Sequence, residues 1–436
     1  MIRTIFAAAL LLGPLAAAAD SPGRIHRTEV IPYDLRRNAE QGDRTGLGAL
    51  IPFAPQPLAA EEEGVLVGQT VDIPYAWTDG EVYLHLENVG TAYTLAVNGT
   101  KVAEVESAAV PAEFRLTPAI REGRNVVLLA LRRSRAEELD TAPAARPAFG
   151  NCYLYAQNKR SIRDFEIALV PDTAGRDFAM LDLKIVAQNG FNYDEPVEVG
   201  YDIYSPQGKL LDFDMREVTI PGRSVDTVRF APFIYHAFEN KWTAGGAKNP
   251  PLYKVMLFTR RNGAYKEYMP LKLGFADARL AGGRFENFGR EQRLAEARYN
   301  AAADRKTTLA ELKALKAQGR NTLLPDAPQP AWFYDLCDEL GLWVIDRADI
   351  AASPRRADRR VGGTPSNDPA LADEYLERVQ AMYYRSRNHT CILAYALGGD
   401  AGNGYNMYKA YEWLKSVERR RPVIYADADG EWNSDL

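Results

Sequence analysis

The chain has 436 residues, of which 46% are hydrophobic and 25% are charged, a composition typical of folded proteins with room for two or three hydrophobic cores. Its formal net charge of −5 and its lack of a basic stripe exclude the surface that phosphate backbones require. We therefore expect no nucleic-acid partner.

The first nineteen residues have the pattern of an export signal. Arg3 precedes an apolar run over residues 5–15, and Ala17-Ala18-Ala19 stand before Asp20. The run is shorter than the ~20 residues that cross a bilayer core, and no cysteine follows it for lipid attachment. We expect a signal peptide over residues 1–19 and a mature chain without a transmembrane span. Its expected location is the periplasm, the outer membrane or the exterior.

The cysteines and histidines indicate no cofactor site. Cys152, Cys337 and Cys391 lie far apart in apolar stretches, which is typical of small core residues, although a disulfide between two of them stays open. The four histidines have no ligand spacing with one another, so we expect no metal site built on them.

Strand patterns dominate residues 64–156. EVYLHLE at 81–87 alternates apolar and polar positions and places His85 on the polar side, as in a half-buried strand. A later strand meets Asn98-Gly99, a pair that adopts the positive φ angles of a tight hairpin. Several short strands with almost no helical period predict a β-sandwich.

A second β region covers residues 161–273, where Pro206-Gln207-Gly208 and Arg261-Asn262-Gly263 separate strand-like runs. It predicts a second, smaller sandwich.

Helical and strand patterns alternate after Gly274. Leu309, Leu312 and Leu315 form one helical stripe, and apolar runs end in acidic or small residues. This alternation predicts parallel βαβ units, whose sites lie at the carboxyl ends of the strands. The strand candidates lie near Ala297, Asn321, Trp343, Ile392 and Val423, with the stub of a sixth at 432–436.

Three sequence segments, taken in chain order, closely resemble those of glycoside hydrolase family 2, in its β-galactosidase branch. They are PPLYKVMLFT (250–259), FYDLCDELGLWVIDRADI (333–350) and RSRNHTCILAYALGGDAGNGYNMYKAYEWLKSVERRRPVIYADADGEWNSDL (385–436). The resemblance implies a jelly-roll sugar-binding domain over residues 20–158, an immunoglobulin-like β-sandwich over 159–273, and a TIM-type (β/α) barrel domain over 274–436. The fold class is therefore multidomain β plus α/β, with an incomplete barrel of about five strands.

The family's acid/base position is altered here. In the family the fourth barrel strand ends in an Asn-Glu pair, the Glu being the general acid/base and the Asn a ligand to the sugar 2-hydroxyl. This chain has Gly399 and Asp400 instead. Asp retracts the carboxyl group by one methylene, and a misplacement of ~1 Å can cost on the order of a hundredfold in rate.

Other family positions are also replaced. The Glu and His that the family uses around magnesium correspond to Ala351 and Ser353, so we expect no magnesium. The Arg and His after the second strand are lost in residues 324–328, and the family's Asn-Arg-His is Asn300-Ala301-Ala302. The family's nucleophile, a Glu on a later strand, falls beyond Leu436.

Several side chains near the expected pocket have two interpretations. Asn300, Gly399, Tyr405 and Trp432 take positions where a sugar would bind, since aromatic faces stack on sugar rings, but core packing fits both aromatic residues as well. The strand-end acids can line the pocket or be solvated loop residues. They are Asp349, Asp400, Asp427 and Asp429. Asp346 is interpreted as structural, with Arg347 as its ion-pair partner.

These replacements predict an exported, catalytically inactive relative that binds a glycan or serves as a structural or partner subunit in the cell envelope. The open edge of a five-stranded half-barrel would be covered by the other domains, an envelope protein or a second copy. The alternative is an active or weakly active glycosidase on β-galactosides, with Asp400 as acid/base and a partner chain supplying the nucleophile. The third interpretation is that the chain is a decaying gene product without a selected role.

Overall fold

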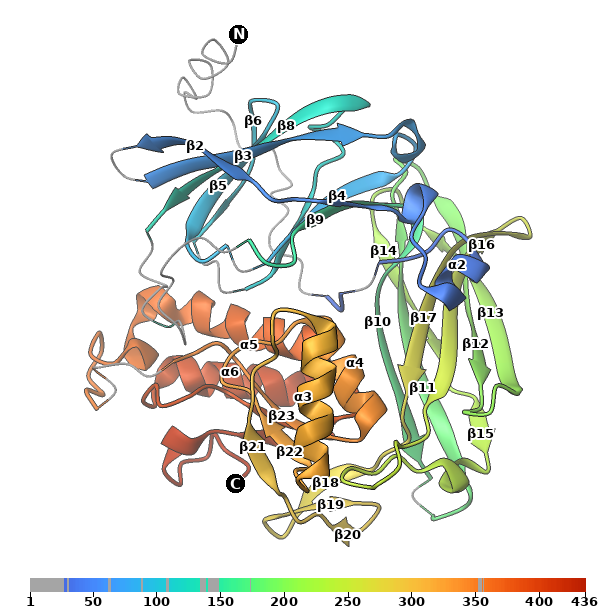
Figure 1. Ribbon diagram of the computed structural model, residues 1–436, viewed down its shortest axis with the longest axis vertical. Helices are drawn as coiled ribbons and strands as arrows, with labels where there is room; N and C mark the ends of the chain where they lie inside the picture. Colours follow the sequence, from blue (N-terminus) through green and yellow to red (C-terminus); the bar gives the residue numbers. More distant parts are fainter. Residues whose placement is uncertain are drawn as a thin grey trace. The chain divides into compact units, whose positions relative to one another are not determined.

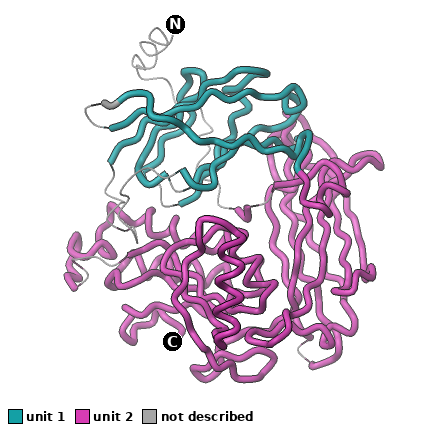
Figure 2. Tube along the Cα trace, viewed as in Figure 1, with its two compact units in different colours: residues 1–25, 44–137, 144–159 teal, residues 26–43, 138–143, 160–436 magenta. Residues whose placement is uncertain are grey.

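The computed structural model describes residues 27–29, 31–61, 64–87, 89–106, 110–133, 139, 149–172, 174–351, 355 and 357–436. The predicted signal peptide and Ser353 lie outside the described residues. The chain divides into two compact units (Figure 2). The first comprises Arg44–Glu137 and Ala144–Lys159, and the second comprises His26–Asp43, Glu138–Pro143 and Arg160–Leu436.

The first unit contains two antiparallel sheets that share one hydrophobic core (Figure 1). One sheet has the order β1-β9-β4-β7 and the other β2-β3-β8-β5-β6. The core includes Leu84 and Leu154 from the first sheet and Leu95 and Leu129 from the second. The strands are β1 Leu50–Pro52, β2 Gln56–Glu61, β3 Gly64–Ile73, β4 Glu81–Leu86, β5 Ala92–Val97, β6 Thr100–Val105, β7 Ala112–Arg115, β8 Gly123–Arg132 and β9 Tyr153–Gln157.

The hairpin at Asn98-Gly99 is confirmed. Both residues have positive φ angles, 51° and 84°, and they join β5 to β6. Asn98 Oδ1 also accepts a hydrogen bond from the backbone N–H of Val126, which fixes the turn against β8.

The half-buried interpretation of residues 81–87 is wrong. Every residue of β4 is buried, including His85. The ring of His85 stacks on Tyr153 at a centroid distance of 4.8 Å, and Tyr83 stacks on Tyr155 at 5.3 Å. Cross-strand aromatic pairs from β9 therefore cover the face that the alternation assigned to solvent.

The second unit begins with two further antiparallel sheets, ordered β10-β11-β14 (with β15 on β11) and β13-β12-β16-β17, around a second core. The predicted turns are confirmed: Gly208 has φ 87° between β12 and β13, and Asn262 and Gly263 have φ 50° and 79° between β16 and β17. The strands are β10 Arg160–Pro171, β11 Phe178–Asn189, β12 Glu195–Tyr204, β13 Leu210–Ile220, β14 Val225–Phe230, β15 Phe233–Tyr235, β16 Tyr253–Arg261 and β17 Ala264–Leu273.

A parallel sheet with the order β21-β22-β23-β24-β25 follows, as the five strand candidates predicted. The small antiparallel sheet β18-β19-β20 precedes it. Buried strand residues such as Leu323, Val344 and Leu393 pack with the helices in one core. The strands are β18 Ala278–Ala281, β19 Arg284–Asn287, β20 Arg290–Glu291, β21 Glu296–Arg298, β22 Thr322–Leu324, β23 Trp343–Arg347, β24 Ile392–Ala396 and β25 Val423–Ile424.

The helices follow from their apolar stripes and caps. In α3 the predicted stripe faces the core. Leu312 is buried, and Leu309 and Leu315 pack against the core cluster. Asp304 caps this helix by accepting a hydrogen bond from the N–H of Thr307 at 2.9 Å. The described α-helices are α2 Arg36–Gln41, α3 Arg305–Ala317, α4 Ala331–Leu340, α5 Ala372–Ser386 and α6 Tyr405–Val417. The 3₁₀ turns are η1 Gly46–Gly48, η2 Tyr75–Trp77, η4 Ala237–Asn240, η5 Pro365–Asn367, η6 Pro369–Leu371 and η7 Ala426–Ala428.

Within the described ranges, the helices are too short or too polar to cross a bilayer.

The parallel sheet does not close into a barrel, since in the described part of the chain β21 and β25 each pair with one neighbour only. Residues 432–436 form turns rather than the predicted sixth strand. They nevertheless cover the outer edge of β25. The N–H of Val423 donates to Asp435 Oδ2 at 2.7 Å, and the Val423 carbonyl accepts from the Asp435 N–H at 2.8 Å. The N–H of Tyr425 donates to Ser434 Oγ.

Asp435 is the centre of this edge cover. Its side chain also accepts hydrogen bonds from the Tyr411 hydroxyl at 2.7 Å and the Lys415 ammonium at 2.8 Å. Burial alone would raise the pKa of Asp435, but the hydrogen bonds from Lys415, Val423 and Tyr411 lower it overall. The ionised carboxylate therefore stabilises the fold above the ordinary Asp value of 3.8, and this contribution is lost as the pH falls through the lower folded value.

We expect D435N to lower the free energy of unfolding by about 1–3 kcal/mol at pH 7, because hydrogen bonds to a charged group are weakened. The difference from the wild type should shrink at pH 3. Urea unfolding at both pH values measures it, with D194N, a substitution of an exposed carboxylate, as control. Equal effects of the two variants would contradict the role of Asp435.

Candidate functional site

The carboxyl ends of the parallel strands place the predicted site residues along one edge of the sheet. Asn300 follows β21, Asp326 follows β22, Asp349 follows β23, Gly399-Asp400 follows β24 and Asp427 follows β25. Because the strands are parallel and in register, these segments meet at the same end.

Asn300 and Asp326 hold the first two strand-end loops together. Asn300 Oδ1 accepts hydrogen bonds from the Asp326 N–H at 2.9 Å and from Gln329 Nε2 at 3.1 Å. Asp326 Oδ1 in turn accepts from Arg298 Nη1 at 2.9 Å. The oxygen of Asn300 is therefore engaged within the protein.

Arg347 lies between these loops and Gly399. Its Nη2 donates to the backbone carbonyl of Asp326, and Nη1 lies 3.9 Å from Asp326 Oδ1. A Cβ atom built on Gly399 would lie 3.4 Å from Nη1, so the guanidinium borders the space that a side chain at position 399 would enter. Burial lowers the pKa of Arg347, while the charges of Asp326, Asp349 and Asp400 act in the opposite direction.

Asp400 itself is exposed at the end of the β24 segment, next to this guanidinium. The structure thus places five predicted or neighbouring site residues in a row, each beside the next: Asn300, Asp326, Arg347, Gly399 and Asp400.

The predicted ion pair between Asp346 and Arg347 is wrong. The carboxylate of Asp346 is fully buried and accepts hydrogen bonds from the Tyr334 hydroxyl at 2.8 Å and from the backbone N–H of Arg347. Its cationic partner is Arg385 of α5, whose Nη2 lies 3.8 Å from Asp346 Oδ2. Neighbouring side chains of a strand point to opposite faces, which directs the guanidinium of Arg347 away from Asp346.

Asp349 belongs to a buried charge cluster. Arg378 Nη1 donates to the Asp349 carbonyl and lies 3.7 Å from Asp349 Oδ2, and Arg378 Nε donates to Glu374 at 2.6 Å. The Arg378 side chain is 1% exposed. The sequence analysis missed Arg378, although the i,i+4 spacing of Glu374 and Arg378 on a helix is a recognisable signal for an ion pair.

The loop after β24 is fixed by hydrogen bonds from both sides. The N–H of Gly402 donates to Asp427 Oδ2 at 2.7 Å, and its carbonyl accepts from the hydroxyls of Ser366 and Tyr425. Asn403 and Asn433 exchange two amide hydrogen bonds at 3.1 and 2.9 Å. Asp427 therefore serves as an acceptor within the loop.

The two aromatic candidates lie on or beside α6. Tyr405 begins this helix and is 58% exposed, with Lys409 Nζ 5.6 Å from the ring centroid. Trp432 is 54% exposed and packs against Tyr408 and Tyr411 at centroid distances of 5.2 and 5.7 Å. Both aromatic residues therefore lie at the surface and not in the hydrophobic core.

Of the two positions at which the family holds magnesium, the structure describes Ala351. Ala351 is buried, and its methyl group offers no ligand atom. A second group of potential metal ligands lies in another part of the second unit. Ligand atoms of Asp177, before β11, His236, after β15, and Glu239, in η4, lie within 4.8 Å of one another, and all three residues are exposed.

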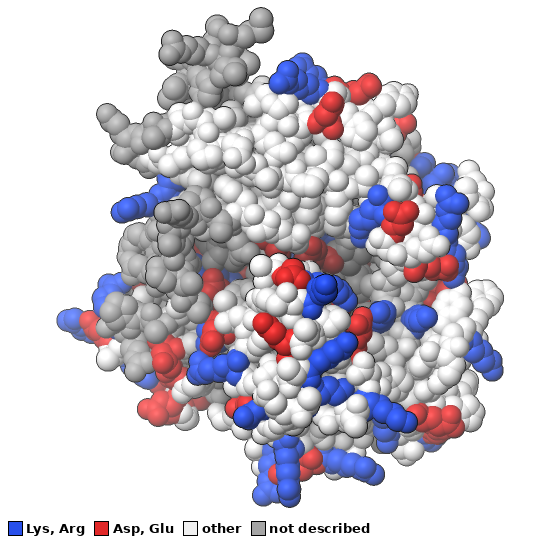
Figure 3. Space-filling model, viewed as in Figure 1, with Lys and Arg blue, Asp and Glu red and all other residues white. Residues whose placement is uncertain are grey.

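On the face shown in Figure 3, acidic and basic side chains are interspersed.

Comparisons with known proteins agree with this architecture. Residues 296–435 match the family model of the glycosyl hydrolases family 2 TIM barrel domain. β-Galactosidases of Psychromonas ingrahamii and Vibrio cholerae are 24% and 26% identical over 390 and 361 residues, which cover 86% and 78% of this chain. The chain spans 37% and 34% of the lengths of these relatives.

Solved structures show the same fold. A β-glucuronidase of Bacteroides uniformis has a TM-score of 0.69 at 16% identity, over 83% of this chain and 46% of its own. An exo-chitosanase of Amycolatopsis orientalis has a TM-score of 0.69 at 17% identity, over 84% of this chain and 45% of its own. Residues 296–435 thus match a glycoside hydrolase family 2 domain, and the chain is similar to the β-galactosidases of that family.

We expect R378M to lower the free energy of unfolding by roughly 3–5 kcal/mol, because it leaves the buried carboxylate of Glu374 without its partner. Urea unfolding measures the loss, and R290M on an exposed arginine is the matched control. A loss no larger than that of R290M would show that the cluster does not hold this edge of the sheet.

Proposed function

We propose that this chain is an exported, non-hydrolytic member of its family that acts by binding, as a carbohydrate-binding or structural subunit of the cell envelope. The observation that carries the proposal is the guanidinium of Arg347 beside Gly399, tied to Asp326 at the edge where the family's chemistry would take place.

Hydrolysis with retention needs two carboxyl groups about 5–5.5 Å apart, one to protonate the leaving oxygen and one to attack the anomeric carbon. By resemblance Asp400 takes the position of the first, with a side chain one methylene short. The carboxylates around it already have partners. Asp326 accepts from Arg298, Asp349 lies beside Arg378, and Asp427 accepts from Gly402.

The same edge supports a binding role. Tyr405 and Trp432 expose much of their rings, and aromatic faces stack on the apolar face of sugars. The loop that connects β24 to Tyr405 is fixed by Asn403, Asn433 and Ser366, so the ring would be presented on a preorganised support.

The alternative is a weakly active glycosidase on β-galactosides, in which Asp400 is the acid and a partner chain supplies the nucleophile. The exposure of Asp400 and the similarity to β-galactosidases favour it. However, Gly399 and Ala351 belong to this chain, so a partner could not supply the groups that they lack.

We expect no turnover of a chromogenic β-galactoside by the purified chain. The double variant G399N/D400E should also remain inactive, because Arg347 and Ala351 are unchanged. Circular dichroism of both proteins serves as the control for folding. Turnover by the unmodified chain that D400A abolishes would establish the alternative.

We also expect a glycan array or a pull-down from envelope extract to yield a ligand. A glycan whose binding Y405A or W432A weakens would identify the binding module, and a protein partner would identify the structural role. Absence of both, together with little folded protein in the envelope, would contradict the proposal and favour a decaying gene product.

A further inference from the structure

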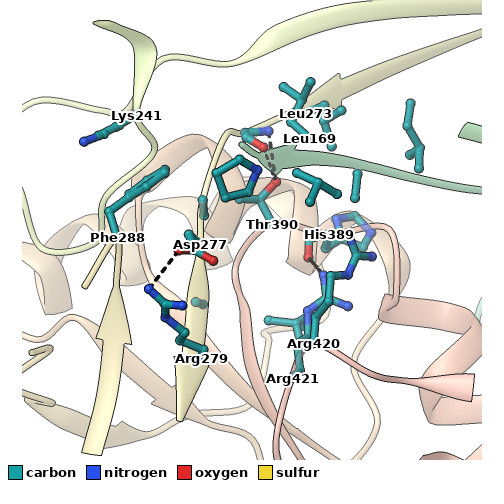
Figure 4. A pocket seen from close by; sticks show the side chains of 18 of the residues that line it. Leu169, Lys241, Leu273, Asp277, Arg279, Phe288, His389, Thr390, Arg420 and Arg421 are labelled. Atoms are coloured by element: carbon teal, nitrogen blue, oxygen red, sulfur yellow. Dashed lines mark hydrogen bonds and ion pairs between the residues drawn. The ribbon is translucent and has the colours of Figure 1, made fainter. Parts of the chain in front are cut away.

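A cavity of about 600 Å³ lies in the second unit, and Figure 4 shows the side chains that line it. It lies at the opposite end of the parallel sheet from the strand-end site. Ile392, the first residue of β24, and Arg421, which precedes β25, both line it. Strand β10 and the end of β17 supply apolar walls, among them Leu169 and Leu273. Its volume lies in the range of small-molecule sites, roughly 300–1,000 Å³.

The lining carries an excess of positive charge. Its cationic residues are Lys241, Arg279, Arg419, Arg420 and Arg421, and its acidic residues are Asp172 and Asp277. Arg279 lies 3.4 Å from Asp277, and Asp172 pairs with Arg176 outside the lining. The acidic residues are thus already neutralised.

Two further cations, Arg421 and Lys241, contact other groups of the protein. Arg421 donates to the carbonyls of Arg387 and His389 and to Glu418, which fixes it in the wall. The ammonium of Lys241 lies 4.4 Å from the ring centroid of Phe238.

Arg419 and Arg420 differ from these. Both are exposed, and across the described ranges neither guanidinium forms an ion pair with a carboxylate. The cavity therefore has two adjacent arginines available to an anion.

His389 adds a directed polar group to the same cavity. Its Nδ1 lies 2.8 Å from Asp338 Oδ2, and the other oxygen of Asp338 accepts from the Cys391 N–H at 2.7 Å. Asp338 is buried and has both oxygens engaged, so it fixes the orientation of the imidazole. With Nδ1 bonded to the carboxylate, Nε2 is the ring nitrogen left for a ligand.

The surroundings of His389 favour its protonated form, whose positive charge attracts an anion. Burial alone would lower the pKa of His389, and Arg421 acts in the same direction. The hydrogen bond and charge of Asp338, with the charge of Asp335, raise it overall. The protonated imidazole donates from both nitrogens.

We infer that this cavity binds a small oxyanion ligand, a carboxylate or phosphate group on a sugar-sized scaffold, through Arg419, Arg420 and His389. The apolar walls contact the scaffold, and the arginines pair with the oxyanion in bidentate geometry. A neutral ligand would leave this charge excess uncompensated. The site is separate from Asp400 and does not depend on the function proposed above.

The test is isothermal titration of the complete chain with inorganic phosphate, galactose 6-phosphate, galacturonate and galactose. We expect at least one of the three anions to bind, and galactose to bind at least tenfold more weakly than that anion. A preference for phosphate or for carboxylate identifies the group that the site takes. Failure of all three anions to bind would overturn the inference, whatever the outcome for β-galactoside hydrolysis.

The variant R419Q/R420Q should weaken anion binding at least tenfold. H389N keeps an amide donor near the position of Nδ1 for Asp338 and removes Nε2, so it should weaken binding as well. The matched control is K306Q/K313Q, which removes the same two charges from exposed positions on α3. Equal weakening by the control would show that binding reflects net charge only and would overturn the site.

Discussion

The second unit depends on one constraint: charged side chains that lie within or beside its parallel sheet have to be paired inside the protein. A parallel sheet covered by helices is shielded from water, and an unpaired charge there costs several kcal/mol. Asp346 meets this constraint through Tyr334 and Arg385, and Arg378 meets it through Glu374 and Asp349. These pairs connect strand ends to helix α5 and so fix the loops in which a site would form.

The same constraint determines which carboxylates at the strand ends are paired within the protein. A catalytic carboxylate has to remain available to substrate, with a pKa suited to proton transfer. Here Asp326 and Asp349 neutralise arginines, and Asn300 holds the neighbouring loop. Gly399 leaves space that the guanidinium of Arg347 borders. The exposed groups at this edge include Asp400 and the rings of Tyr405 and Trp432.

Local patterns in the sequence predicted much of this fold. The apolar runs located all five parallel strands, and Asn98-Gly99 and Asn262-Gly263 marked hairpins because their positive φ angles are a local property. Long-range pairing was not predictable in the same way. The partner of Asp346 is 39 positions away (385 − 346), on another element, whereas the adjacent Arg347 points to the opposite face.

The candidate site shows the same limit. The sequence located Gly399 and Asp400 at the end of β24, but the hydrogen bonds that engage Asn300 and Asp427 depend on loops from other strands. Residues 432–436 were predicted to be the stub of a sixth strand, yet the polar side chains of Ser434 and Asp435 cover the edge of β25 by hydrogen bonding to it. His85 was assigned to solvent because aromatic stacking across strands leaves no periodic signal.

The proposed binding role requires that Asp400 faces no second carboxylate able to attack the anomeric carbon of a bound sugar. A 2-deoxy-2-fluoro-β-galactosyl fluoride traps the carboxylate nucleophile of retaining enzymes as a covalent ester, since the glycosyl-enzyme intermediate then hydrolyses slowly. Intact mass spectrometry of the chain after this treatment should show the unmodified mass. A stoichiometric adduct on an Asp or Glu residue would contradict the account.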